Sequence, residues 1–304
     1  MRPRFRLLLS TALFWLATVL TCNAQTVTAN AEFGLGVSAY KQAKYEEAVQ
    51  HFRQAVLLDP TFVPAHLHLA SAYAQQYIPG VDSPENNQMG QQAVGQYGQV
   101  LALNPTRDQQ VSALKGIAYL YLNMKQFERA KEYDRKILEI DPDDPQTYYA
   151  IGVIDWTQSY QLRMEQRAKL NLKPDEPLIG TGECWKVRAE NEERVEDGIE
   201  MLTKAISIRQ TYDDAMAYMN LLYRERADIQ CGNTRAYHSD IRTADQWVDV
   251  TMATKKATVV SSSRAHNRYG NGLLVARLRL AERAAFPFFD GVFILLPLSV
   301  ERFW

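Results

Sequence analysis

The chain has 304 residues, 46% hydrophobic and 23% charged, which fits a folded body of one elongated or two compact domains. Its 34 basic and 35 acidic residues give a formal net charge of -1. Because phosphate binding needs a basic excess or a basic stripe, this balance argues against nucleic acid as a partner.

The first 24 residues have the pattern of a secretory signal peptide. Three arginines precede a short apolar run from Leu7 to Leu20, and Cys22-Asn23-Ala24 is a small-x-small cleavage signal. The run is short for a membrane span. We therefore expect cleavage after Ala24 and export to the periplasm or cell envelope, with secretion from the cell as an alternative. As an alternative, Val19 to Cys22 resembles a bacterial lipobox, which would place a lipid on Cys22 and make the protein an outer-membrane lipoprotein.

From residue 29 onwards, the sequence repeats a pair of helical patterns. The second helix of a pair is clearest between Tyr45 and Pro60, where Ala48, Phe52 and Ala55 share one face and the proline ends the helix. Small residues on a buried face let a neighbouring helix approach closely. The same spacing recurs at Ala93, Tyr97 and Pro105, at Ala130, Asp134 and Pro142, and in degraded form at Gly198, Leu202, Ala205 and Gln210.

Upstream of each of these helices lies a partner helix with an apolar residue, usually a small residue next, and often a tyrosine shortly after. These positions are filled by Leu35-Gly36 and Tyr40, Leu69-Ala70 and Tyr73, Ile117-Ala118 and Tyr121, Ile151-Gly152, and Met219-Asn220 and Tyr223. Over about residues 29 to 256 the pattern resembles the tetratricopeptide repeat.

The resemblance implies an all-α superhelical solenoid of about five helix pairs, because one pair is too poor in apolar surface to fold alone. We expect a repeat domain over residues 25–258, with units near 29–62, 63–106, 111–144, 145–212 and 213–257. Asp134 and Asp155 depart from the family pattern by replacing a bulky residue and a tyrosine. Insertions are expected in the second unit, from Gln76 to Met89, and in the fourth, between about Gln158 and Arg194. The fourth insertion is expected to extend the first helix to about Leu170 and to be followed by a long helix from about Trp185 to Ile208.

The family places the first helix of each pair on a concave inner face. Carried over position by position, the resemblance puts seven residues there, which we call the inner-face residues: Phe33, Tyr40, Leu67, Tyr119, Tyr149, Trp156 and Arg224. An aromatic lining suits an extended peptide or a partner helix. The alternative for each residue is that it only packs against a neighbouring repeat.

Two cysteines, Cys184 and Cys231, follow the leader, and an even number in an oxidising compartment permits one disulfide. The resemblance places the helix that begins near Cys184 beside, and antiparallel to, the helix that ends before Cys231. Our hypothesis is a disulfide Cys184–Cys231, which closes a loop of about 45 residues and stabilises the fold by roughly 3–4 kcal/mol. The alternative is two unpaired thiols.

Motifs for catalysis or metal binding are scarce. His66 and His68 are two positions apart on a helix, so they point to different faces and make a poor metal pair. The segment from Gly180 to Trp185 resembles a nucleophile loop, but no histidine lies near Cys184 in sequence to act as its base. We therefore expect neither metal nor cofactor, and an enzyme built on the inserted segment is the least favoured hypothesis.

The last part of the chain, residues 259–304, lacks the repeat periodicity. Ser261-Ser262-Ser263 looks like a linker, and the apolar stretch from Phe286 to Val300 is broken by two prolines, an Asp and a Gly. Three interpretations stay open: a tail of low order or weak packing, an element that touches a membrane or partner, and a stretch not selected to fold.

Together, these patterns predict a non-catalytic scaffold or adaptor of the cell envelope that binds an unidentified protein partner on its concave face. The alternative is a lipid-anchored envelope lipoprotein that serves an assembly complex. Membrane contact is expected only through Cys22 or the tail.

Overall fold

The computed structural model describes residues 28–173, 176–178 and 180–268, and within these residues it contains helices and no strand. A first helix covers residues 28–41. It is followed by α2 (Tyr45–Leu58), α3 (Val63–Gln76), α4 (Pro84–Ala102), α5 (Arg107–Asn123), α6 (Phe127–Ile140), α7 (Pro145–Lys169), α8 (Glu183–Ile208), α9 (Asp213–Asp228) and α10 (Thr234–Arg268).

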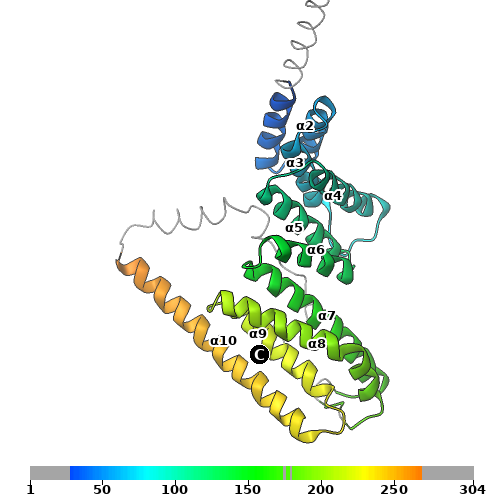
Figure 1. The fold of residues 1–304 in the computed structure, drawn as a ribbon, viewed down its shortest axis with the longest axis vertical. Coiled ribbons are helices and arrows are strands. Elements are labelled where there is room, and N and C mark those ends of the chain that lie inside the picture. The colour runs from blue at the N-terminus through cyan, green and yellow to red at the C-terminus, as the bar shows by residue number, and fades with distance from the viewer. Residues whose placement is uncertain (1–27, 174–175, 179, 269–304) are drawn as a thin grey trace, which may run out of the picture.

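Consecutive helices pack against one another and form an elongated stack (Figure 1). The stack runs from the blue first helix to the yellow and orange α10, and each pair of helices leans on the next pair. The predicted all-α solenoid of about five helix pairs is therefore confirmed over the part of the chain that the structure describes.

Small residues set the close approach of the two helices within a pair. Ala48, Ala93 and Ala130 are completely buried. Gly36 lies against the ring of Phe52, where a methyl group on the glycine would come within 2.5 Å of the ring. These positions explain why the sequence repeats alanine and glycine on one face of each helix.

Local signals in the sequence account for several helix ends. Ser83 caps α4 by accepting a hydrogen bond from the backbone N–H of Asn86, and Thr106 forms a capping box with Gln109 at the start of α5. Asp144 caps α7 by accepting from the backbone N–H of Gln146. Each cap satisfies backbone donors that the helix itself leaves unpaired.

The interior is divided into two apolar clusters. The first core is built from the helix over residues 28–41 and from α2 to α6, and among its buried members only Ile154 comes from α7. The second core is built from α7 to α10 and the loop before α8, and it includes Trp156, Leu178 and both cysteines. The contact between α6 and α7 is where the first core gives way to the second.

The insertion in the fourth unit lengthens both of its helices. The prediction of a first helix to about Leu170 and a second from about Trp185 to Ile208 agrees with the observed α7 and α8. The connecting segment includes Leu178, whose side chain is fully buried in the second core. The insertion is therefore an extension of the array rather than a separate domain.

The last described helix is longer than the sequence pattern predicts. We expected the partner helix of α9 to end near Ala257 and a tail to begin at residue 259, but α10 continues to Arg268. The serine run resembles a linker, yet residues 257–268 contain neither proline nor glycine, so nothing in them stops a helix. In Figure 1, α10 runs alongside α9 and then past it.

Three predictions fall on residues outside the described part of the chain: the signal peptide, lipidation of Cys22, and the remainder of the tail from residue 269. Among the described helices, none combines the length and the apolar character that a membrane span requires.

Candidate functional site

The inner-face residues of the first three units are half-buried and pack against the first core. Phe33, Tyr40, Leu67 and Tyr119 all belong to this group. The ring of Phe33 has its centroid 5.7 Å from that of Phe52 and 5.0 Å from that of His68. Each of these side chains thus packs one side against the first core and keeps part of its surface open to solvent.

The inner-face residues of the fourth unit belong to an aromatic cluster between α7 and α9. Tyr149 contacts Tyr212 and Tyr218, with ring centroids 5.0 and 5.6 Å away. Trp156 stacks on Tyr160 at 5.2 Å and meets Tyr218 edge-on at 5.3 Å. Tyr149 remains half-buried, but Trp156 is only 4% exposed. The indole of Trp156 therefore holds neighbouring repeats together, and little of it is open to a partner.

The seventh inner-face residue, Arg224, is held by its neighbours. Its Nε donates to Asn220 Oδ1 at 2.9 Å, and its Nη2 lies 2.8 Å from Asp245 Oδ1 on α10. Both members of the ion pair are partly exposed, so the pair adds little to stability.

The tyrosines on this face stay uncharged at physiological pH. Burial raises the pKa of Tyr40 to about 12, with Tyr45 adding to the shift and Gln75 opposing it. Burial also raises the pKa of Tyr119, against a hydrogen bond with Asn123, and that of Tyr149. The face therefore presents neutral phenols, which can donate and accept hydrogen bonds.

The two cysteines meet where the extension joins the array. Cys184, in the first turn of α8, and Cys231, beyond the end of α9, form a disulfide with sulfur atoms 2.06 Å apart. Their exposed fractions are 0% and 6%. Cys184 Sγ also lies 3.2 Å from the carbonyl oxygen of Asp228. A catalytic thiolate at Cys184 is incompatible with this bonding, because a disulfide sulfur carries no ionisable thiol.

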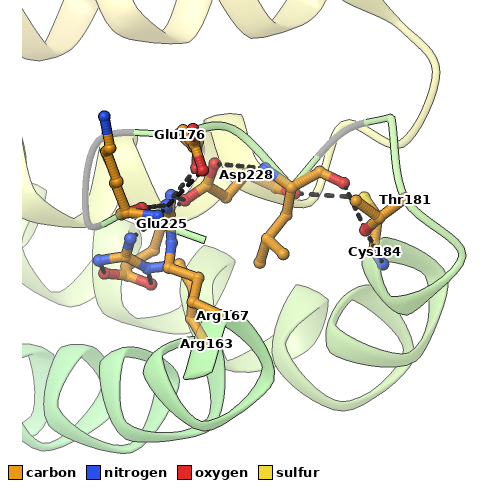
Figure 2. Close-up of polar contacts among 9 residues, drawn as sticks. Arg163, Arg167, Glu176, Thr181, Cys184, Glu225 and Asp228 are labelled. Carbon is orange, nitrogen blue, oxygen red and sulfur yellow. Dashed lines mark hydrogen bonds and ion pairs between the residues drawn. The ribbon is translucent and has the colours of Figure 1, made fainter. Parts of the chain in front are cut away.

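Next to the disulfide lies a buried ionic network, which Figure 2 shows in close-up. Arg163 donates from Nε and Nη2 to the two carboxylate oxygens of Glu225 at 2.6 and 2.8 Å, and from Nη1 to Asp228 Oδ2 at 3.1 Å. Arg167 Nη2 reaches the same Asp228 oxygen at 2.6 Å. The two arginines come from α7 and the two carboxylates from α9, so the network ties the extension to the next repeat.

The same residues also hold the loop of the insertion. Arg167 Nη1 donates to the carbonyl oxygens of Lys173, at 2.9 Å, and Glu176. Asp228 Oδ1 accepts a hydrogen bond from the backbone N–H of Leu178 at 3.4 Å. One guanidinium and one carboxylate thereby link α7, the loop and α9.

The electrostatics of this network are those of a structural ion pair. Burial raises the pKa of the Glu225 carboxyl, and the charge of Arg163 works against that shift. Burial alone would lower the pKa of Arg163, but Glu225 and Asp228 raise it. Sequence reasoning missed this network. The available signal was the spacing of Arg163 and Arg167 by four residues on a helix predicted to be extended.

No metal centre is found in the described residues, since no group of three or more His, Cys, Asp or Glu side chains gathers there. His66 is engaged through its ring nitrogens with Gln96 Oε1, at 2.8 Å, and with the carbonyl oxygen of Pro60, at 3.0 Å. His68 Nδ1 is bonded to the carbonyl oxygen of Pro64 at 2.9 Å. Both histidines thus have packing and hydrogen-bonding roles.

Comparison with protein families finds matches to two segments of the repeat array. A family profile described as TPR repeat matches residues 36–76, and one described as tetratricopeptide repeat matches residues 113–144. The chain contains tetratricopeptide repeats. The two matches cover the junction of the first and second helix pairs and the third pair of the tetratricopeptide array. No curated protein matches the chain by sequence.

Solved structures share the architecture of the array. The MamA protein aligns with a TM-score of 0.51 at 11% identity, over 76% of this chain and 94% of that chain. A double mutant of MamA RS-1 aligns with a TM-score of 0.50 at 16% identity, over 76% and 96%. YrrB, described as a TPR protein with an unusual peptide-binding site, gives a TM-score of 0.46 at 11% identity, over 77% and 90%. At such identities the likeness to the two MamA structures concerns the fold alone.

Proposed function

We propose that the protein is a non-catalytic interaction scaffold of the cell envelope, which binds a peptide or a partner helix along its inner face. The observation that carries this proposal is the half-buried, uncharged aromatic lining contributed by the first helices of successive repeats. Tyr40, Tyr119 and Tyr149 keep part of their rings accessible while the core fixes their orientation, and pre-positioned aromatic groups are effective anchors for binding.

The surroundings of the lining hold the part of it on α7 and α9 in place. The disulfide and the buried network of Arg163, Arg167, Glu225 and Asp228 join the extension to α9. This part of the lining therefore loses little conformational entropy when a partner binds. Cys184 is tied up in the disulfide, which removes the residue on which an enzymatic hypothesis for the insertion depends.

Site-specific photo-crosslinking tests the proposal. A benzophenone amino acid at Leu67, on the inner face, is expected to capture a discrete partner in envelope extract. The matched control carries the same group at Leu57 of α2, which is 73% exposed and is not among the inner-face residues. Capture that is equal at the two positions, or stronger at Leu57, would overturn the proposal.

The contribution of the lining is measured by substitution in the same assay. Tyr119→Ala and Tyr149→Ala are expected to reduce the yield from the Leu67 crosslinker, whereas Trp185→Ala is not, because Trp185 lies 60% exposed on the extension. Trp156→Ala is avoided, since its loss would disturb the packing between α7 and α9.

Anchoring by lipid is the second candidate, and the sequence from Val19 to Cys22 is the observation that favours it. In that case the array serves an assembly complex from the membrane surface. Metabolic palmitate labelling that disappears in Cys22→Ala would support the lipoprotein, and an unlabelled wild type would exclude it.

A further inference from the structure

Three ionisable residues occupy the α6–α7 contact at register positions that are apolar or aromatic elsewhere in the array. Lys131 corresponds to Val49, Val94 and Ile199; Asp134 corresponds to Phe52, Tyr97 and Leu202; Asp155 corresponds to Tyr73, Tyr121 and Tyr223. Lys131 and Asp134 are 6% exposed and Asp155 is 0% exposed. At these three register positions the third and fourth repeats therefore meet through buried charges, whereas the corresponding positions of the other repeats carry apolar or aromatic side chains.

One cluster of charges is centred on Lys131. Its Nζ lies 2.5 Å from Asp155 Oδ1 on α7 and 3.4 Å from Asp197 Oδ2 on α8. Asp197 Oδ2 also forms an ion pair with Arg135 Nη2 at 2.9 Å. The second oxygen of Asp155 is buried and accepts no hydrogen bond from a donor group among the described residues. Asp197 acts on the same carboxyl, because its charge and its side-chain hydrogen bond both raise the pKa of Asp155.

A second cluster surrounds Asp134. Lys115 Nζ on α5 lies 2.5 Å from Asp144 Oδ2, and Asp144 accepts further hydrogen bonds from the Thr147 hydroxyl at 2.7 Å and the Gln146 N–H at 3.2 Å. The charged groups that act on Asp134 are Asp144, at the start of α7, and Lys115. Lys115 is thus already engaged by one carboxylate before Asp134 ionises.

Burial raises the pKa of Asp134 from 3.8 to about 8; the charge of Asp144 adds to the shift and that of Lys115 opposes it. Burial likewise raises the pKa of Asp155 to about 7, against the attraction of Lys131. Near neutral pH, Asp134 keeps its proton while it is buried. If the contact opens to water, the carboxyl regains its ordinary pKa and releases the proton to solvent.

The sign of the pH dependence follows from these shifts. A carboxyl whose pKa is raised in the closed contact stabilises it in acid, and this stabilisation is lost as the pH rises from about 4 to about 8. Above about pH 8, Asp134 is ionised in both the closed and the open contact, so it no longer changes the stability of the closed contact. Asp155 acts in the same direction, over a pH range that ends near its raised pKa of about 7.

These charges lie where two parts of the array meet, so their titration changes the stability of the contact between those parts. Among the described residues, the first core is built from the elements before α7 except for Ile154, and the second core is built from α7 onwards, so the charged contact lies at the junction of the two cores. We propose that the α6–α7 contact is a hinge, at which the halves formed by residues 28–140 and 145–260 close in acid and open as Asp134 loses its proton. Figure 1 shows the two halves above and below this contact.

A distance measurement across the contact tests the hinge. A ketone-bearing amino acid placed at the exposed positions Gln99 of α4 and Lys204 of α8 carries one spin label on each half without using a cysteine. Between about pH 5 and about pH 8.5, the full chain is expected to show a shifted and broadened distance distribution at constant helix content. Asp134→Asn, which keeps the size but cannot ionise, is expected to abolish the response.

The matched control is Asp143→Asn, which removes an exposed carboxyl close to the same contact and should leave the response intact. An unchanged distribution in the wild type overturns the inference, and so does a response in Asp134→Asn equal to that of the wild type. Loss of helix over the same pH range also counts against it, because unfolding is not rotation about a hinge. None of these readouts depends on a binding partner.

Discussion

Arg163 and Glu225 form a two-pronged ion pair in which Nε and Nη2 of the arginine lie 2.6 and 2.8 Å from the two carboxylate oxygens. Glu225 is 2% exposed. Arg163 lies in the part of α7 that extends beyond an ordinary repeat, and Glu225 lies near the end of α9. The pair therefore fixes the direction of the extension relative to the next repeat, because a guanidinium and a carboxylate joined by two parallel hydrogen bonds can rotate little relative to each other.

Removing one member of this pair leaves a buried charge without its partner. Arg163→Met is expected to lower the free energy of unfolding by about 3–5 kcal/mol, and the double variant Arg163→Met, Glu225→Leu should recover much of that loss. Urea unfolding of the two variants measures both values. Lys186→Met, which breaks an exposed pair with Glu183, serves as the control and should change stability by less than about 0.5 kcal/mol.

The disulfide should contribute through the unfolded chain. Cys184 and Cys231 are 47 residues apart, so the double variant Cys184→Ser, Cys231→Ser is expected to lose roughly 3–4 kcal/mol in the chain-entropy model. Serine at position 184 can donate a hydrogen bond to the carbonyl oxygen of Asp228, which keeps the buried group satisfied. A urea midpoint equal to that of the oxidised wild type would contradict the prediction.

The sequence predicts the fold well because each repeat carries the small residues at which its two helices make contact. Alanine and glycine recur at the helix contacts, and Ala48, Ala93 and Ala130 lie buried as that pattern requires. The ionic network has no comparable signal, since Arg163 and Glu225 are 62 residues apart and only the folded insertion brings them together. For Trp156 the sequence leaves open an accessible face or packing against a neighbouring repeat, because its burial depends on Tyr160 and Tyr218, whose positions the periodicity does not specify.

Gly152 offers a direct test of the close helix contact in the fourth pair. A methyl group there would meet Leu202 at 2.6 Å and the carbonyl oxygen of Gly198 at 3.2 Å. Gly152→Ala is therefore expected to destabilise the protein by about 1–3 kcal/mol through overpacking. Gly98→Ala on α4, where a methyl group meets nothing within 4 Å, should instead stabilise its helix by about 0.5–1 kcal/mol. Thermal unfolding of the two variants should move the midpoint in opposite directions.

Lys131 should matter more as the pH rises. Its attraction lowers the pKa of Asp155 against the effect of burial, leaving a value of about 7. In Lys131→Met that attraction is gone, so the carboxyl is expected to hold its proton to a higher pH. The wild type loses stability through this group only between about 4 and about 7, whereas the variant continues to lose stability above that range.

At about pH 8.5, Lys131→Met is therefore expected to cost about 3–5 kcal/mol, and at about pH 5.5 markedly less, because Asp155 is then neutral in both proteins. Lys136→Met breaks the exposed pair with Glu132 on the same helix and should cost less than about 0.5 kcal/mol at either pH. Urea titrations at the two pH values compare the variants. If the cost of Lys131→Met is the same at both, the carboxyl of Asp155 does not depend on Lys131 for its charge.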